Sequence, residues 1–199
     1  MHGAEGVDVA TCEAPAQEAL GIATMAGREG VTLTRVSDGE ATTLSNLLQL
    51  YIHDLSDAFP NVELGRDGLF RYDQLPLYWT RPDERFGFLI RSHGNLAGFA
   101  LAKRGSPATD DPTVLDVAEF FVVRRYRRDG VGREAARLLW NTLRGKWTVR
   151  ISEGNKGALL FWAQTVSELV RNVNVSLLPG NPNAWRVYSF DSADLTHPS

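Results

Sequence analysis

Hydrophobic and polar residues alternate along several short stretches of the chain and fall at helical spacing along others. Alternation with a period of two is typical of a strand that buries one face, whereas apolar residues three and four apart are typical of an amphipathic helix. The pattern predicts strands over residues 31–36, 85–91, 95–103, 113–123, 147–151, 173–178 and 185–190. It predicts one helix that follows Glu40 and ends at Phe59, and two more over residues 131–142 and 158–170.

Two local signals refine this outline. Ser37 and Glu40 have the spacing of a capping box, which marks the start of the first helix. Residues 61–83 contain glycine, proline and aromatic side chains without a clear period, and aromatic side chains are rarely left bare in water. We expect this segment to fold over a pocket.

The length of 199 residues favours one domain, which we place at residues 31–190. Residues 1–30 are rich in alanine, glycine and glutamate, so we expect a poorly ordered extension with a short helix near residues 15–23. Residues 191–199 form a tail. Met25 closely precedes the first predicted strand and is an alternative start of the chain.

Composition excludes several classes of protein. The 21 Lys and Arg against 24 Asp and Glu give a net charge of -3, which argues against wholesale nucleic-acid binding. A lone cysteine, Cys12, cannot form an intrachain disulfide, and no Cys/His cluster indicates a metal site. No apolar run approaches the ~18 residues of a membrane helix, and the acidic first 30 residues do not resemble a secretory signal. We expect a cytoplasmic protein that holds no metal.

The most informative stretch lies after the fourth predicted strand, where a basic loop leads into a helix. Gly130 and Gly132 stand at the start of that helix. Free amides at a helix start bind anions, and glycine permits close approach. Arg127, Arg128 and Arg133 add positive charge that would suit a pyrophosphate. The spacing alone leaves open a tight helix entry with solvated arginines.

The loop and helix start read Arg127-Arg128-Asp129-Gly130-Val131-Gly132. This run resembles the Arg/Gln-x-x-Gly-x-Gly/Ala motif of the GNAT (general control non-repressible-related) N-acetyltransferase superfamily. The preceding residues 119–123 look like the central strand of that fold. Asn155-x-x-Ala158, followed by Phe161 and Trp162, is similar to its second motif. The resemblance covers residues 31–190 in the family's order of elements.

The resemblance implies an α/β fold: a mixed, mostly antiparallel sheet of six to seven strands, splayed in the middle, with about four flanking helices. It also implies acetyl-CoA as co-substrate. The amides of Phe121, Val122 and Val123 would bind the pantetheine arm, and the side chain of Asn155 would help to hold it. The pyrophosphate would lie on the amides of Arg128, Asp129, Gly130, Val131, Gly132 and Arg133, with the charge of Arg127 close by.

The implied reaction is acetyl transfer to an amine by direct attack in a ternary complex, which needs no cysteine. Glu119 shares strand parity with Val117 and Phe121, and a carboxylate among apolar neighbours has a raised pKa. The resemblance makes Glu119 the general base; pairing with an arginine or exposure at a bulge remain alternatives. Trp162 stands where many members have an acidic tyrosine, and indole does not titrate usefully, so we expect it to pack in the core.

The acceptor stays open between a small molecule and a peptide amine. His53 and Asp54 would bind an amine or be solvated, and Tyr51 belongs to the buried face of its helix. Tyr72, Tyr78 and Trp79 would line an acceptor pocket or pack as a lid. The alternative function is an acyl-CoA-binding sensor or interaction module with little turnover. A homodimer would be usual for such a fold.

Overall fold

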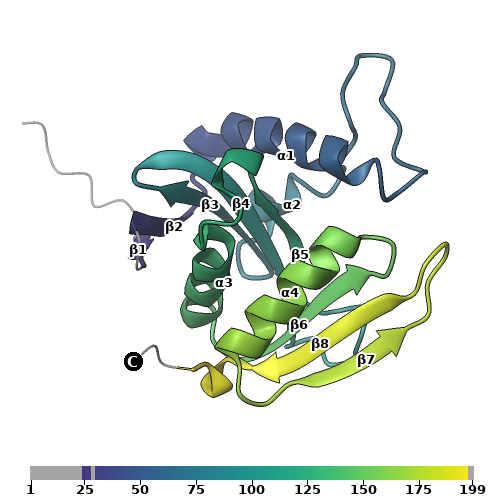
Figure 1. Ribbon diagram of the computed structural model, residues 1–199. Helices are drawn as coiled ribbons and strands as arrows, with labels where there is room; N and C mark the ends of the chain where they lie inside the picture. The colour runs from purple at the N-terminus through teal and green to yellow at the C-terminus, as the bar shows by residue number, and fades with distance from the viewer. Residues whose placement is uncertain (1–23, 28–29, 197–199) are drawn as a thin grey trace, which may run out of the picture.

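The computed structural model describes residues 24–27 and 30–196, and its centre is one eight-stranded sheet (Figure 1). The strand order is β1-β2-β3-β4-β5-β6-β8-β7. All neighbouring strands are antiparallel except β5 and β6, which are parallel. The strands are β1 (Thr24–Ala26), β2 (Val31–Arg35), β3 (Arg85–Ser92), β4 (Asn95–Arg104), β5 (Leu115–Val122), β6 (Lys146–Ser152), β7 (Asn174–Leu178) and β8 (Trp185–Asp191).

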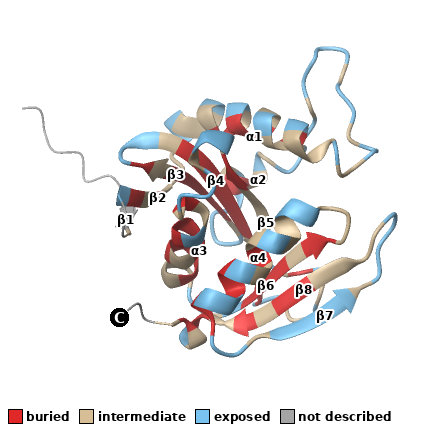
Figure 2. Cartoon of the chain, viewed as in Figure 1, coloured by how far each residue is buried: buried red, intermediate tan, exposed pale blue. Residues whose placement is uncertain are grey.

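Four helices cover the two faces of this sheet. One face packs against α3 (Val131–Thr142) and α4 (Lys156–Leu169), whose apolar sides join the larger hydrophobic core. The other face packs against α1 (Ala41–Leu55) and the single turn α2 (Leu77–Thr80), which form a second core. Figure 2 shows the buried residues on the central strands and on the inner sides of the helices. The fold is therefore the predicted mixed α/β sandwich, with short β1 as an eighth strand.

The sheet opens between β5 and β6. These strands pair only where Leu115 to Val117 lie beside Trp147 to Val149. Beyond Val117 the two strands separate, while β5 continues along β4 and β6 continues along β8. Beyond Val117, the backbone amides and carbonyls of β5 and β6 that face each other are thus not hydrogen-bonded to each other. This splay is the predicted one, and it places a gap at the middle of the sheet.

A β-bulge in β5 changes which face each residue meets. Glu119 lies opposite Leu101, but Val117 lies opposite Ala102, so Ala118 is one extra residue. A bulge of this kind breaks the two-residue alternation. Val117 consequently faces α3 and α4, whereas Glu119 and Phe121 face α1. The predicted common parity of Glu119 and Val117 is wrong for this reason.

The start of the domain follows the sequence signals in part. The carboxylate of Glu40 accepts hydrogen bonds from the amide and the hydroxyl of Ser37, at 3.1 and 2.9 Å, as a capping box requires. A 3-10 turn, η2 (Asp38–Glu40), leads into α1. Residues 24–26 pair with β2, so the predicted poorly ordered extension is too long at that end. The helix predicted near residues 15–23 lies outside the described residues.

Candidate active site

A pocket of about 530 Å³ lies at the splay. Its walls come from α1, from the segment that follows α1, from β5, β6 and β8, and from the start of α4. The segment after α1 projects beyond the helix end in Figure 1, and its residues 59, 61–63 and 70–72 line the pocket. This confirms the expectation that the irregular segment folds over a pocket. We call residues 56–76 the covering segment.

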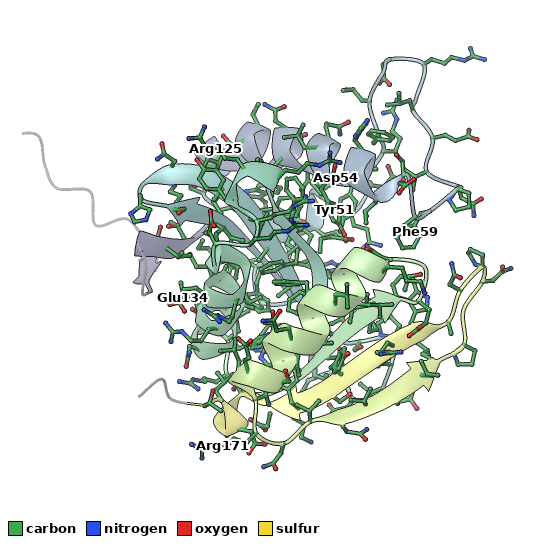
Figure 3. The ribbon with its side chains drawn as sticks, in the orientation of Figure 1. Tyr51, Asp54, Phe59, Arg125, Glu134 and Arg171 are labelled. Carbon is green, nitrogen blue, oxygen red and sulfur yellow. The ribbon has the colours of Figure 1, made fainter. Side chains whose placement is uncertain are left out.

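Glu119 lies in this pocket and is held by two tyrosines. The hydroxyl of Tyr51, on α1, donates to Oε2 at 2.5 Å. The hydroxyl of Tyr72, on the covering segment, donates to Oε1 at 3.1 Å. Figure 3 shows Tyr51 beneath α1 on the side that faces the sheet. The carboxylate therefore joins three elements that are far apart in the sequence.

Burial raises the pKa of Glu119 above its ordinary value, although the hydrogen bonds from Tyr51 and Tyr72 and the charge of Arg150 oppose the rise. Burial and the negative charge of Glu119 also raise the pKa of Tyr51 and of Tyr72. Both tyrosines consequently keep their protons at neutral pH and act as donors. Glu119 is an oriented carboxylate whose proton affinity is increased, which is what a general base requires.

Arg150 occupies the facing wall of the pocket, on β6. Its Nε and Nη2 donate to the two oxygens of Asp116 at 2.9 and 2.8 Å, and Asp116 is fully buried. Its guanidinium also lies 5.7 Å from the ring centroid of Trp185. Because Asp116 already neutralises Arg150, the pairing alternative for Glu119 is not realised with this arginine. The positive charge of Arg150 lowers the pKa of Glu119. The ion pair with Asp116 fixes Arg150 in the wall of the pocket.

The residues predicted to bind an anion lie at the start of α3. Gly130 is the N-cap with φ of 76°, and the amide of Glu134 donates to the carbonyl of Gly130 at 2.9 Å. The amides of Val131, Gly132 and Arg133 thus precede the first helical hydrogen bond, as they do at any helix start. Arg128 also has a positive φ, of 70°. The loop therefore turns twice through the left-handed region before the helix begins.

Two arginines of this loop form ion pairs within the protein, which the prediction did not include. Arg127 donates through Nε to the carbonyl of Val122 at 2.7 Å, and its Nη2 contacts Asp54 at 2.6 Å. Arg124 contacts the other oxygen of Asp54 at 2.7 Å. Partial burial raises the pKa of Asp54, but the hydrogen bonds from Arg127 and Arg124 outweigh burial and hold it below its ordinary value. Through these two ion pairs, Asp54 links α1 to the loop that precedes α3.

Another predicted charge, Arg133, forms an ion pair with Glu168 of α4 at 2.9 Å. This contact ties the first turn of α3 to α4. Arg127 and Arg133 are therefore part of the framework of the loop as well as sources of positive charge.

The end of β5 offers fewer amides to the splay than predicted. The amide of Val123 donates to the carbonyl of Ala97 at 2.8 Å, so it belongs to the sheet. Amides alternate in direction along an antiparallel pair. The amide of Phe121 therefore shares the direction of Val123, whereas the amide of Val122 points toward the splay. Of the three predicted contacts for a pantetheine arm, the register favours Val122.

Asn155 is the N-cap of α4, where its Oδ1 accepts a hydrogen bond of 3.0 Å from the amide of Ala158. The spacing of the second motif therefore has a structural basis, because an N-cap side chain reaches the third residue of its helix. Asn155 also lines the pocket. Its Nδ2 is the donor with which it would hold a ligand there.

Gly132 has a packing role. A Cβ at this position would lie 2.9 Å from Cε2 of Phe161, on α4. Phe161 in turn stacks on Phe120 with ring centroids 5.9 Å apart. The second glycine of the motif therefore lets α3, α4 and β5 approach closely beneath the anion site.

Trp162 is buried in the larger core, as predicted, and it also lines the pocket. Its ring contacts Phe120 edge-on, with centroids 5.1 Å apart. An indole in this place supplies apolar surface next to the splay. It supplies no titrating proton, because indole N–H is only a donor.

The acceptor side of the pocket differs from the prediction. His53 is exposed, Tyr78 and Trp79 lie in α2, and none of the three lines the pocket. Sequence reasoning missed Phe59 and Trp185, whose ring centroids lie 6.2 Å apart and which both line the pocket. No local pattern could have joined them, because one follows α1 and the other begins β8.

Neither a metal-binding group of side chains nor a helix suited to span a membrane is found in the described part of the chain. Within residues 24–27 and 30–196, no group of three or more His, Cys, Asp or Glu side chains could hold a metal ion. Over the same residues, no helix has the length and apolar character that a membrane span needs.

Three solved acetyltransferases illustrate the likeness of the fold. An acetyltransferase from Thermus thermophilus has a TM-score of 0.57 and 17% identity, over 80% of this chain and 97% of its own. A ribosomal L7/L12 α-N-protein acetyltransferase solved with CoA has a TM-score of 0.58 and 8% identity, over 85% and 98%. A spermidine N-acetyltransferase from Vibrio cholerae, solved with CoA and spermine, has a TM-score of 0.55 and 12% identity, over 83% and 97%.

No curated protein sequence matches the chain significantly. The similar structures are too distant in sequence to establish more than the fold. The model of the acetyltransferase (GNAT) family, however, matches residues 47–166, more than half of the chain, and that span contains Glu119, the motif at residues 127–132 and Asn155. The chain belongs to the GNAT family of acetyltransferases.

Proposed function

We propose that this protein transfers the acetyl group of acetyl-CoA to an amine, by direct attack within a ternary complex. The observation that carries the proposal is the placement of Glu119. A carboxylate with a raised pKa faces a pocket at the point where the central strands separate. A module that only bound acyl-CoA would have no need of an oriented base there. We therefore favour the enzyme over the sensor.

Acetyl-CoA fits the residues that surround the splay. The first-turn amides of α3, from Val131 to Arg133, would hold the pyrophosphate, and Val122 and Asn155 would hold the pantetheine arm. The acyl end would then lie in the pocket, beside Phe120 and Trp162, which both line it. The family match and the neighbours solved with CoA support this co-substrate.

The base is needed because amines are protonated in water. A free alkyl amine has a pKa of ~10.4, so roughly one molecule in 2,500 is neutral at pH 7. Glu119 would take a proton from the ammonium group, which frees the nitrogen lone pair to attack the thioester carbonyl. As the new C–N bond forms, the C–S bond breaks and coenzyme A leaves as the thiolate, and the second proton of the nitrogen passes to that thiolate or to water. A positioned base typically contributes ~10²–10⁴-fold to the rate.

The acceptor is a small-molecule or peptide amine. The pocket of about 530 Å³ has room for the acyl end of the co-substrate and for a small amine or the end of a peptide. It carries one further carboxylate, the exposed Glu63. The neighbours named for a protein α-amino group and for spermidine support both kinds of acceptor.

The test is release of free thiol from acetyl-CoA with a panel of monoamines, diamines, amino acids and short peptides. Glu119→Gln keeps size and hydrogen bonding but removes the base, so turnover should fall by ~10²-fold or more. Glu63→Gln removes a carboxylate from the same pocket that does not contact Glu119, and should keep turnover within a few-fold. Full turnover in Glu119→Gln would contradict the role of Glu119, and an absence of turnover with stable CoA binding would favour the sensor.

A further inference from the structure

One side chain of α1, Gln49, binds the backbone of the covering segment. The amide Nε2 of Gln49 donates to the carbonyl of Phe70 at 3.1 Å, and Oε1 of Gln49 accepts from the amide of Phe70 at 2.8 Å. Both backbone groups of a single residue are thus bound by both ends of one carboxamide. This pairing imitates the exchange of two hydrogen bonds between neighbouring strands. It fixes the rotation of the backbone as well as its position.

The backbone that Gln49 fixes leads directly to the carboxylate. Tyr72 lies two residues after Phe70 and donates to Oε1 of Glu119. Phe70 itself lines the pocket, and its ring meets His53 edge-on at 6.5 Å. A shift or rotation at Phe70 would therefore move the part of the pocket wall that this stretch supplies.

The outer part of the covering segment, residues 63–69, packs little against the rest of the protein. Leu64 and Leu69 are 58% and 51% exposed, and most residues from 63 to 69 face solvent. A segment with few buried apolar contacts opens at low free-energy cost. The segment also reaches the far wall, where Phe59 approaches Trp185. The two hydrogen bonds to Phe70 therefore fix the point at which this exposed stretch returns to α1, just before Tyr72 and Leu75 pack against the core beneath that helix.

We propose that Gln49 is a positioning residue for acetyl transfer: by binding the backbone of Phe70, it places Tyr72 against Glu119 and completes the acceptor pocket. This inference rests on the proposed function, because it assigns Gln49 to the acceptor side of the same site. Gln49 does not contact Glu119 and acts through the covering segment. The co-substrate side, formed by α3 and α4, should not depend on it.

Gln49→Met keeps the length of the side chain and removes both hydrogen bonds. We expect KM for the acceptor to rise by roughly tenfold, the loss that two ordinary hydrogen bonds would give, while KM for acetyl-CoA stays within twofold. The acid limb of the pH–rate profile should move to higher pH, because Tyr72 no longer stabilises the ionised form of Glu119. Gln49→Glu keeps the acceptor for the Phe70 amide and should fall between wild type and Gln49→Met.

Gln74→Met is the matched control. Gln74 lies in the same segment, is exposed, and makes one surface hydrogen bond, to Arg85 at 3.1 Å. Its loss should leave acceptor KM and the pH profile unchanged. A second readout needs no acceptor: trypsin cleaves after arginine, and Arg66 and Arg71 are exposed in the covering segment. Gln49→Met should be cut there several-fold faster than wild type, with an unchanged urea midpoint.

Unchanged acceptor KM, pH profile and tryptic cleavage in Gln49→Met would overturn the proposal. Equal losses of acceptor and acetyl-CoA binding with a lowered urea midpoint would also overturn it, because they indicate a general structural role. Failure of the proposed function has a different signature. In that case wild type would release no thiol with any amine, while the difference in tryptic cleavage between Gln49→Met and Gln74→Met would remain.

Discussion

Tyr51 donates a 2.5 Å hydrogen bond to Glu119 across the space between α1 and β5, and its own ring packs edge-on against Phe99. The donor is therefore fixed by a helix and by the core beneath it. Tyr72, the second donor to Glu119, belongs to the exposed covering segment. The carboxylate thus has one rigid partner and one that moves with the acceptor pocket, and an arriving amine would displace the second more easily.

The two tyrosines should control the acid limb of the pH–rate profile. Each hydroxyl favours the ionised carboxylate and lowers the pKa of Glu119 against the effect of burial. Tyr51→Phe and Tyr72→Phe should therefore both raise that pKa, so that activity is lost at a higher pH as the solution is acidified. The profile of kcat/KM against pH measures this. Tyr126→Phe, a tyrosine outside the pocket, serves as control, and a limb that stayed in place in both variants would contradict the assignment.

Glu119 should reduce stability at neutral pH. Its folded pKa is raised above the unfolded value, so its favourable contribution is complete below the unfolded pKa and is lost as pH rises through the folded pKa. Glu119→Gln does not ionise. Urea unfolding should therefore find the variant at least as stable as wild type near pH 8, with the difference disappearing near pH 4. A variant that is clearly less stable at the higher pH would disprove this.

Gly130 should be essential for binding coenzyme A. At a ligand concentration a hundredfold above Kd, binding stabilises a fold by ~2.7 kcal/mol. Gly130→Val places a branched side chain at a φ of 76° beside the anion site and should abolish most of that gain. The control is Gly94→Val, which has nearly the same φ of 78° in the hairpin between β3 and β4. Both variants should lose stability, but only Gly130→Val should lose the thermal shift with coenzyme A.

Asp54 should affect the binding of acetyl-CoA, although Asp54 does not line the pocket. Asp54→Asn removes the charge that holds Arg124 and Arg127, and Arg127 also binds the carbonyl of Val122. We expect KM for acetyl-CoA to rise several-fold while acceptor KM changes little, the reverse of the Gln49 variants. Asp57→Asn, close by in the sequence and exposed, is the matched control. Unchanged co-substrate binding in Asp54→Asn would show that the loop keeps its shape without these ion pairs.

The sequence predicted those parts of the fold that rest on local rules. Periodicity located the strands and helices because side-chain direction repeats every two or 3.6 residues, and the capping box at Ser37 acts within one turn. The start of α3 at Gly130 was visible for the same reason. The ion pairs of Asp54, the carboxamide of Gln49 and the meeting of Phe59 with Trp185 join segments far apart in the chain, and no short pattern encodes them. Glu119 was found by residue type, although the bulge placed it on the other face.

The bulge at Ala118 changes which face of the sheet the odd-numbered residues of β5 point toward. Before it, odd-numbered positions of β5 supply the core beneath α3 and α4; after it, odd-numbered positions supply the core beneath α1. A strand of the same length without the bulge would carry every later residue of β5, Glu119 included, to the opposite layer. A single residue with no partner across the strand thus decides which side of the sheet receives the carboxylate. Any redesign that straightens this strand has to shorten it by one residue to keep the carboxylate beneath α1.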